Sequence, residues 1–298
     1  MSTPVLLFVT GLGLGALYFL LAAGLSLTYG LMRVLNFAHG VFLTIGAYTA
    51  WMIATHVGGS EWVRFGLALG GSLLVGAVAA AAVELSLIRP LYRRHVEQIL
   101  ITVGLALALT ALTQGAFGAD PRPYPSPGWM DRVTVLAGAD IPNSRLAAIA
   151  AAALVLAALA GFLRFTRWGT IVRAGVENRE MVSALGIDVQ RAFTLVFALG
   201  GVAAALGGAL AASYFGNIDP QRGGDVLIFA FIVVVIGGLG SITGSAVAAA
   251  VVGVMQQFAN YYFGVWWGFS AAGDLAVVAL LAIVLLVRPQ GLAGTAPA

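Results

Sequence analysis

The feature that most constrains this chain is a series of long apolar runs separated by short polar segments. A helix needs about 20 apolar residues to cross a bilayer. Only 9% of the 298 residues are charged, whereas soluble domains contain roughly a quarter. We therefore predict an all-α fold, a polytopic bundle of transmembrane helices. The runs that we interpret as single spans are 5–29, 41–55, 63–88, 99–117, 146–163, 192–214 and 271–287.

A further apolar run, 226–258, is too long for one helix and is interrupted by glycines at 237–244. It predicts either two shorter spans or a broken, re-entrant pair, because irregular backbone at membrane depth is tolerated only where protein buries it or where it lines a cavity. The expected total is eight or nine spans with broken or re-entrant helices. We treat residues 1–298 as a single transmembrane domain, in which 118–145 is a loop too polar to span.

A polar segment, 164–191, carries five of the fifteen arginines and three of the twelve acids. It cannot lie in hydrocarbon, since a charge at the bilayer centre costs at least about 2.5–3.5 kcal/mol. Within it, 177–185 consists of helix-forming residues, and Gly186 ends the predicted helix. Met181, Ala184 and Leu185 lie at i, i+3 and i+4 on one face of that helix. The segment is therefore either an ordinary solvated loop helix or a docking helix for a soluble partner.

Arginine positions predict the orientation of the bundle. The segment 89–95 holds three arginines and is separated from 164–191 by two predicted spans, so both lie on the same, more basic face. The basic face of a membrane protein is generally cytoplasmic. We therefore place 164–191 inside the cell and expect 118–145, 216–225 and the N-terminus outside. The positive charge of these loops reports orientation, so we expect no nucleic-acid partner.

Composition excludes several classes of function. The chain has no cysteine, which excludes disulfides, thiolate metal sites and cysteine nucleophiles. It has no lysine, so it cannot supply a Walker A motif, and ATP-driven work must come from another subunit. Metal-ligand clusters and hydrolase motifs are also missing. Ser26 and His39 resemble an intramembrane protease dyad only by chance, and we expect no enzyme, metal or cofactor in this chain.

Polar residues at the two breaks are candidates for a solute pathway. Asn36 either caps the following helix, accepting the N–H of residue 38 or 39, or faces the pathway. His39 is either a hydrogen-bonded packing histidine or a pathway residue. Ser241 and Thr243 either satisfy backbone groups freed by the glycine kinks or contact a polar substrate. The two breaks resemble each other, and paired interrupted helices indicate a transport path.

Three acids lie close to predicted helix ends. Glu84, five residues before Arg89, is expected to snorkel or to pair with an arginine. Asp225 directly precedes an apolar helix and is expected to be its N-cap. Asp274 is expected to cap or to pair, with Ser270 as a rival cap. Because these acids form no series within the spans, they do not indicate a proton relay.

Four stretches together resemble a known family. The run 24–48 contains N-F-A-H-G-V-F-L-T-I-G-A-Y, and 177–191 reads E-N-R-E-M-V-S-A-L-G-I-D-V-Q-R. The stretch 235–253 contains G-G-L-G-S-I-T-G-S-A, and 285–294 reads L-L-V-R-P-Q-G-L-A-G. They resemble the permeases of branched-chain amino-acid ABC importers, most closely the smaller of the two permease subunits of the high-affinity importer. The loop before Arg145 resembles the family least.

The resemblance implies a multi-pass permease subunit in a bacterial inner (cytoplasmic) membrane, surrounded by membrane lipid. Its implied partners are a second homologous permease, two ATPase subunits that bind the ATP, and a periplasmic substrate-binding protein. The implied coupling helix that docks on the ATPase comprises Glu177, Asn178, Glu180, Met181, Ala184, Leu185 and Gly186.

The resemblance also implies inward transport of branched-chain amino acids, or a similar small polar solute, by alternating access. Members of the family also carry urea, short amides and aromatic acids, and nothing in the predicted path selects among these solutes. The alternative from a different class is a self-sufficient channel or facilitator for a small neutral solute such as urea or an amide, with the broken helices as its filter.

Overall fold

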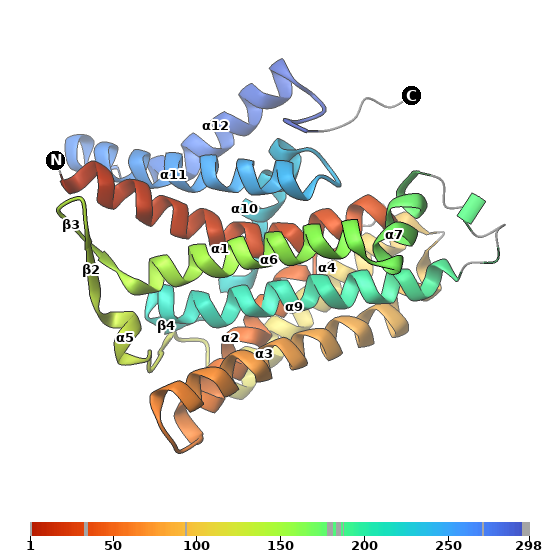
Figure 1. The fold of residues 1–298 in the computed structure, drawn as a ribbon, viewed down its shortest axis with the longest axis horizontal. Helices are drawn as coiled ribbons and strands as arrows, with labels where there is room; N and C mark the ends of the chain where they lie inside the picture. Colours follow the sequence, from red (N-terminus) through yellow and green to blue (C-terminus); the bar gives the residue numbers. More distant parts are fainter. Residues whose placement is uncertain are drawn as a thin grey trace.

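The chain forms one bundle of helices of unequal length (Figure 1). The computed structural model describes residues 2–32, 35–92, 94–177, 181–182, 186, 188–269 and 271–293. The α-helices are α1 Ser2–Met32, α2 His39–His56, α3 Glu61–Val83, α4 His95–Phe117, α5 Gly128–Asp131, α6 Asn143–Phe165, α7 Arg167–Glu177, α9 Val189–Phe215, α10 Arg222–Gly237, α11 Ile242–Trp267 and α12 Ala272–Val287. A π-helical turn Glu84–Ile88 and a 3-10 turn Arg89–Leu91 prolong α3.

The all-α membrane bundle is confirmed, but a count of eight or nine spans is not. Among the described residues, six helices are long and apolar enough to cross a membrane: α1, α3 with its extension, α4, α6, α9 and α11. The other predicted spans correspond to shorter or more polar helices. α10 and α12 have 16 residues each, and α2 has 18 residues with a histidine at either end.

The long run 226–258 is broken as predicted. α10 ends at Gly237, and α11 begins at Ile242. Gly238 and Gly240 have φ angles of 98° and 88°, in the left-handed region that glycine adopts without strain. The glycines therefore create the break that separates two helices.

Two long helices, α1 and α9, form the centre of the bundle. In each, 72% of the most apolar 18-residue window is buried, compared with 6% for α4 and 17% for α6 at the perimeter. Small residues allow the central helices to approach closely. A Cβ atom on Gly15 of α1 would overlap the Ala249 carbonyl of α11, and one on Gly76 of α3 would overlap the backbone of Gly201 in α9.

One end of the bundle, which we call the hairpin end, carries the strands. β2 Val133–Leu136 pairs antiparallel with β3 Ala139–Pro142, and β1 Arg122–Pro123 pairs with β4 Asn217–Ile218. The predicted loop 118–145 is thus folded and shorter than expected, since α6 already begins at Asn143. Val9 of α1 packs on Ala139 and Ile141, so the N-terminus lies at this end.

The opposite end, which we call the α7 end, carries α7 and the start of α9. Figure 1 shows α7 at the far side of the bundle from β2 and β3. A Cβ atom on Gly169 of α7 would overlap the backbone of Phe162 and Leu163 in α6, and one on Gly175 would touch Leu31 near the end of α1. The two polar parts of the chain therefore lie at opposite ends of the apolar helices.

Candidate functional site

The chain enters α2 through a buried turn built by Asn36. The Asn36 Oδ1 accepts the backbone N–H of Ala38 at 3.0 Å, and its carbonyl oxygen accepts that of His39 at 3.2 Å. This is the predicted hydrogen bond, although Ala38 itself occupies the cap position of α2. Asn36 is fully buried, and its Nδ2 has no hydrogen-bond partner within the described structure.

His39 fills a slot between two central helices. Its ring lies against Gly24 of α1 and Gly200 of α9, and it meets Phe42 edge-on at 5.6 Å. This position agrees with the predicted packing role of His39. The ring nitrogens have no well-formed hydrogen bond among the described residues, and the closest acceptor for them is the Leu21 carbonyl of α1. Burying unpaired polar atoms is costly, which makes this position unusual for a purely structural side chain.

The starts of α2 and α10 meet inside the bundle. A Cβ atom on Gly40 would overlap the Gly223 carbonyl, and one on Gly223 would overlap the Gly40 carbonyl and approach the Thr44 hydroxyl. Two helix N-termini, each with a partial positive charge, thus lie side by side.

The second predicted break lies at the α7 end. Ser241 caps α11, its Oγ accepting the Gly244 N–H at 3.1 Å, which is the local explanation considered for it. Thr243 is exposed, and Gly240 packs on Gly30 near the end of α1. No hydrogen bond or ring contact between described residues joins Ser241 or Thr243 to Asn36 or His39.

Of two further acids, Asp225 differs from its predicted role, whereas Asp274 makes a pairing contact, one of the two roles predicted for it. Asp225 is not the N-cap of α10, because α10 begins at Arg222 and Asp225 lies in its first turn. Asp219 instead accepts the Gln221 N–H at 2.9 Å just before the helix. Asp274 pairs with Gln256, whose Nε2 donates to Asp274 Oδ1 at 2.7 Å.

The predicted coupling helix is described only in part. Asn178, Glu180, Ala184 and Leu185 lie outside the described residues, and Glu177 is described only as the last backbone position of α7. Met181 is 60% exposed, whereas Val182 is 3% exposed and belongs to the core. Gly186 has a φ angle of 78°, consistent with the predicted helix end. Met181 thus points to solvent, and the adjacent Val182 points into the bundle.

Sequence reasoning missed the helix that precedes this segment. α7 begins after Thr166, whose Oγ1 accepts the Gly169 N–H at 2.9 Å. Its inward positions, Gly169, Val172 and Gly175, recur at spacings of three, which would have indicated a helix. α7 is strongly amphipathic and lies against α6 and α1, so the polar segment is anchored to the bundle on its N-terminal side.

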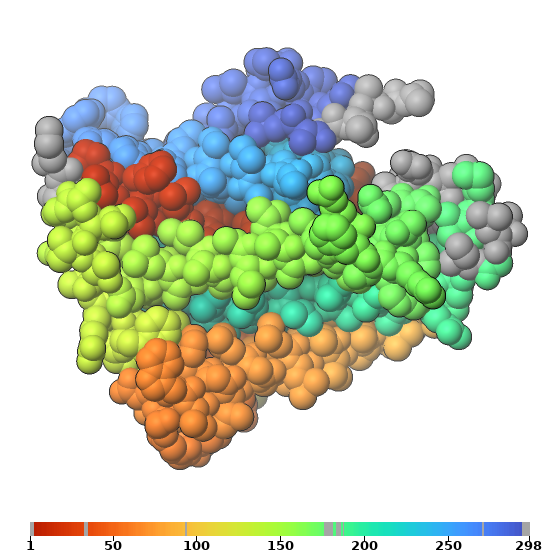
Figure 2. All heavy atoms as spheres, viewed as in Figure 1, coloured from red at the N-terminus to blue at the C-terminus, as the bar shows by residue number. Residues whose placement is uncertain are grey.

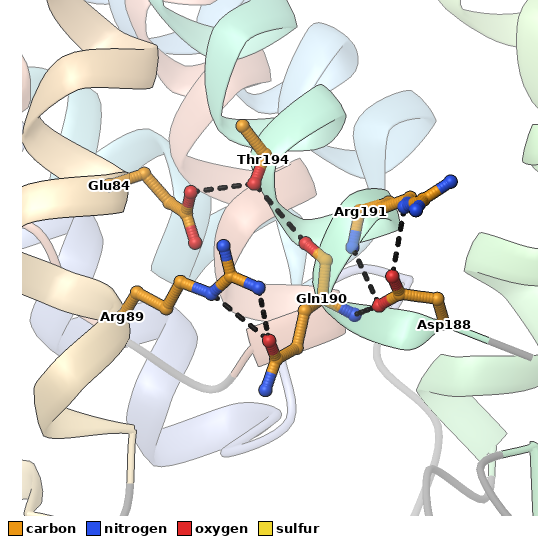
Figure 3. A network of polar contacts seen from close by, with 6 residues as sticks. All are labelled: Glu84, Arg89, Asp188, Gln190, Arg191 and Thr194. Carbon is orange, nitrogen blue, oxygen red and sulfur yellow. Dashed lines mark hydrogen bonds and ion pairs between the residues drawn. The ribbon is translucent and has the colours of Figure 1, made fainter.

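A polar network anchors the C-terminal side of that segment (Figure 3). Asp188 caps α9, its Oδ1 accepting the N–H groups of Gln190 at 3.1 Å and Arg191 at 3.3 Å. The Arg191 Nε lies 2.9 Å from Asp188 Oδ2. Gln190 in turn accepts hydrogen bonds from Arg89, with Nε at 3.0 Å. The start of α9 is thereby tied to the 3-10 turn after α3.

Glu84 is the buried member of this network. Its Oε2 accepts a hydrogen bond of 2.6 Å from the Thr194 hydroxyl, and its Oε1 accepts one from the Tyr92 hydroxyl. The predicted pairing with an arginine is therefore wrong, since Arg89 reaches Gln190 instead. The carboxylate is fully buried in the π-helical turn and links that turn directly to α9.

The hairpin end holds an open groove of about 550 Å³. Trp51, Thr55, Arg122 and Tyr124 line it together with two prolines, and the Arg122 guanidinium lies 5.4 Å from the Trp51 ring centre. Burial raises the pKa of the Tyr124 phenol above its ordinary value. The groove presents aromatic and cationic groups at the hairpin end of the bundle.

Two arrangements considered from the sequence, a Ser26–His39 pair and a metal cluster, are not found among the described residues. Ser26 is buried, and no hydrogen bond joins it to His39. No group of three or more histidine, aspartate or glutamate side chains that could hold a metal ion occurs in the described part of the chain. The polar groups described above instead join neighbouring helices or lie at breaks between helices.

Comparisons with known proteins agree with this arrangement. Residues 7–287 match the family model described as the permease component of branched-chain amino acid transport systems. The high-affinity branched-chain amino acid transport system permease protein LivH of Salmonella typhimurium is 29% identical over 292 residues, covering 95% of this chain and 93% of LivH.

Two further relatives broaden the comparison. The permease protein BraD of the same type of system in Pseudomonas aeruginosa is 29% identical over 294 residues, covering 96% of this chain and 94% of BraD. The permease protein LivM of Salmonella typhimurium is 27% identical over 301 residues, covering 93% of this chain and 67% of LivM. No solved structure matches the chain.

Proposed function

Because the chain belongs to the family of branched-chain amino acid transport permeases, we propose that it is the membrane-spanning subunit of an ABC importer. It moves branched-chain amino acids, or a similar small polar solute, inward by alternating access. Separate ATPase subunits supply the energy, since the chain has no lysine for a Walker A motif. The transporter in the bacterial inner membrane is completed by a second permease and a periplasmic binding protein. The second permease resembles this chain, as LivM does.

The observation that carries this proposal is the anchoring of the polar segment on both sides. α7 lies on α6 and α1 before it, and the network of Asp188, Gln190 and Glu84 joins α9 to the extension of α3 after it. A partner that pushes on residues 177–186 therefore acts on helices at the centre of the bundle. A solvated loop with no mechanical role needs no such attachment.

Met181 supplies the contact surface for the ATPase in this proposal. It is 60% exposed next to the buried Val182, at the α7 end, where Gly186 has a positive φ angle. In alternating access, movement of this segment shifts the start of α9 relative to α3. We propose that the helices rearrange around the meeting point of α2 and α10, where Asn36 and His39 lie, and that Ser241 and Thr243 lie closer to the cytoplasmic side of the solute path.

The test is a charge placed in the contact surface. Met181→Arg should reduce co-purification of the ATPase subunits and ATP-driven uptake in proteoliposomes by at least about tenfold, because a buried unpaired charge at an interface is strongly unfavourable. Leu136→Arg is the matched control for association, since Leu136 is 49% exposed on β2 at the hairpin end. Undiminished ATPase binding in Met181→Arg contradicts the docking role. Solute uptake by the chain alone without ATP favours the channel alternative.

A further inference from the structure

A carboxylate lies on an exposed face formed by α11 and α12. Asp274 is in the first turn of α12, and its side chain is exposed. Its Oδ1 accepts a hydrogen bond of 2.7 Å from Gln256 Nε2. The buried Gln256 accepts, through Oε1, a hydrogen bond of 2.7 Å from the Tyr18 hydroxyl. Side chains from three helices thus hold one carboxylate in a fixed position.

This carboxylate lies at membrane depth. Tyr18 is at the middle of the 31-residue α1, and Gln256 is near the middle of the 26-residue α11, both of which can span a membrane. Each end of a 31-residue helix is roughly 23 Å from its middle, and the hydrocarbon layer is about 30 Å thick in total. Asp274 is hydrogen-bonded to Gln256 and therefore lies within the hydrocarbon layer of the bilayer.

A carboxylate at this depth requires a counter-charge or water. Ionisable groups in membrane spans face the bundle interior or an aqueous cavity, or they pair with an opposite charge. Within the described structure the only salt bridge joins Arg191 to Asp188, so no described cation neutralises Asp274. The Asp274 Oδ2 also has no hydrogen-bond donor among the described residues. This face is therefore not a surface that lipid tails cover.

The surroundings of Asp274 are polar and open. Asn260, one turn after Gln256, accepts the Gly273 N–H at 2.7 Å and so ties the start of α12 to α11. Figure 1 shows α12 diverging from α11 beyond this junction, and Figure 2 shows an indentation between α12 and the far end of α11. Amide groups from two turns of α11 thus accompany the carboxylate at the opening between two helices.

We propose that Asp274 binds the ammonium group of the transported solute within the membrane. Gln256 and Tyr18 are positioning residues that fix one carboxylate oxygen and leave the other free to accept from the ammonium. The site fits zwitterionic amino acids and primary amines. The inference rests on the proposed function, because a second permease placed against this face would enclose the carboxylate in a path between the two subunits.

The experiment measures solute binding to the assembled transporter in detergent, without the periplasmic binding protein. The probes are L-leucine, 3-methylbutylamine, which keeps only the ammonium, and 4-methylpentanoate, which keeps only the carboxylate. Asp274→Asn should weaken binding of leucine and the amine by about tenfold or more, the effect of one charge-assisted hydrogen bond. Asp274→Glu should restore part of it. Glu97→Gln is the matched control, since Glu97 is an exposed first-turn acid of α4.

Asp274→Asn keeps a side-chain oxygen that can accept the hydrogen bond from Gln256, so the fold should survive. The variant therefore tests the loss of the negative charge alone. Three results would overturn the inference: wild-type transporter that binds no leucine, 4-methylpentanoate that binds as tightly as leucine, or equal leucine affinity in Asp274→Asn. Loss of the second permease from Asp274→Asn would also overturn it, because the carboxylate would then pair with a cation of that subunit. ATP-driven leucine uptake by the wild type tests the proposed function separately, and its failure leaves the binding comparison intact.

Discussion

The buried carboxylate of Glu84 allows a quantitative prediction. Thr194→Val removes the hydroxyl that donates to Glu84 Oε2 at 2.6 Å while keeping the shape of the side chain. Glu84 is fully buried, so water does not replace the lost donor. A hydrogen bond to a charged group contributes about 1.5–3 kcal/mol, and the free energy of unfolding should fall by that amount. For a chain of this size, the melting temperature should then fall by several degrees.

The assay is thermal unfolding of the full chain in detergent, with Thr113→Val as control. Thr113 is a part-buried threonine of α4 whose hydroxyl donates only to Leu109 in its own helix, so its loss should change stability little. A double-mutant cycle with Glu84→Gln isolates the pair, and we expect a coupling energy of at least about 1 kcal/mol. Equal melting temperatures for Thr194→Val and Thr113→Val would refute the reasoning.

The same variant tests the mechanical role of the network. If Glu84 transmits movement from the polar segment to α3, Thr194→Val should lower the amount of solute imported per ATP hydrolysed. ATPase association should stay normal, because Thr194 lies on α9 beyond Asp188 and Gln190. Uptake that falls only in proportion to the amount of folded protein would show that the contact is structural and not part of coupling.

Two further predictions concern the helix breaks. Gly24→Ala should lower the free energy of unfolding by about 1–3 kcal/mol, because the added Cβ would lie 2.5 Å from the His39 Nε2. Gly104→Ala is the control and should not lower it, because a Cβ at this position has no neighbour within 4 Å outside its own helix. Thermal melts of the two variants compare them directly, and equal melting temperatures would contradict the close packing of His39. Ser241→Ala should lower the free energy of unfolding by about 0.5–2 kcal/mol, because α11 loses its N-cap. Thr243→Val should lower it less. A larger loss of stability in Thr243→Val, measured by thermal melts, would contradict the capping role of Ser241.

Features that depend on neighbouring residues were predictable from the sequence. Apolar runs long enough to span a membrane identified α1, α3, α4, α6, α9 and α11. Glycines with positive φ created the break between α10 and α11 where the sequence placed it, and Ser241 and Asn36 make local hydrogen bonds with the residues that follow them. Such features follow from backbone sterics and from hydrogen bonds within a few residues, so they need no knowledge of the fold.

Features that join distant residues were decided only by the tertiary structure. Glu84 and Thr194 are 110 residues apart, and Tyr18 and Gln256 are 238 residues apart. Nothing in the local pattern around Glu84 distinguishes a hydroxyl partner from Arg89, and nothing near Asp274 reveals its depth in the membrane. The meeting of α2 with α10 depends likewise on how α1 and α9 pack. Polar partners in a helical bundle are selected by which helix faces come together, and many sequences with the same apolar runs allow different pairings.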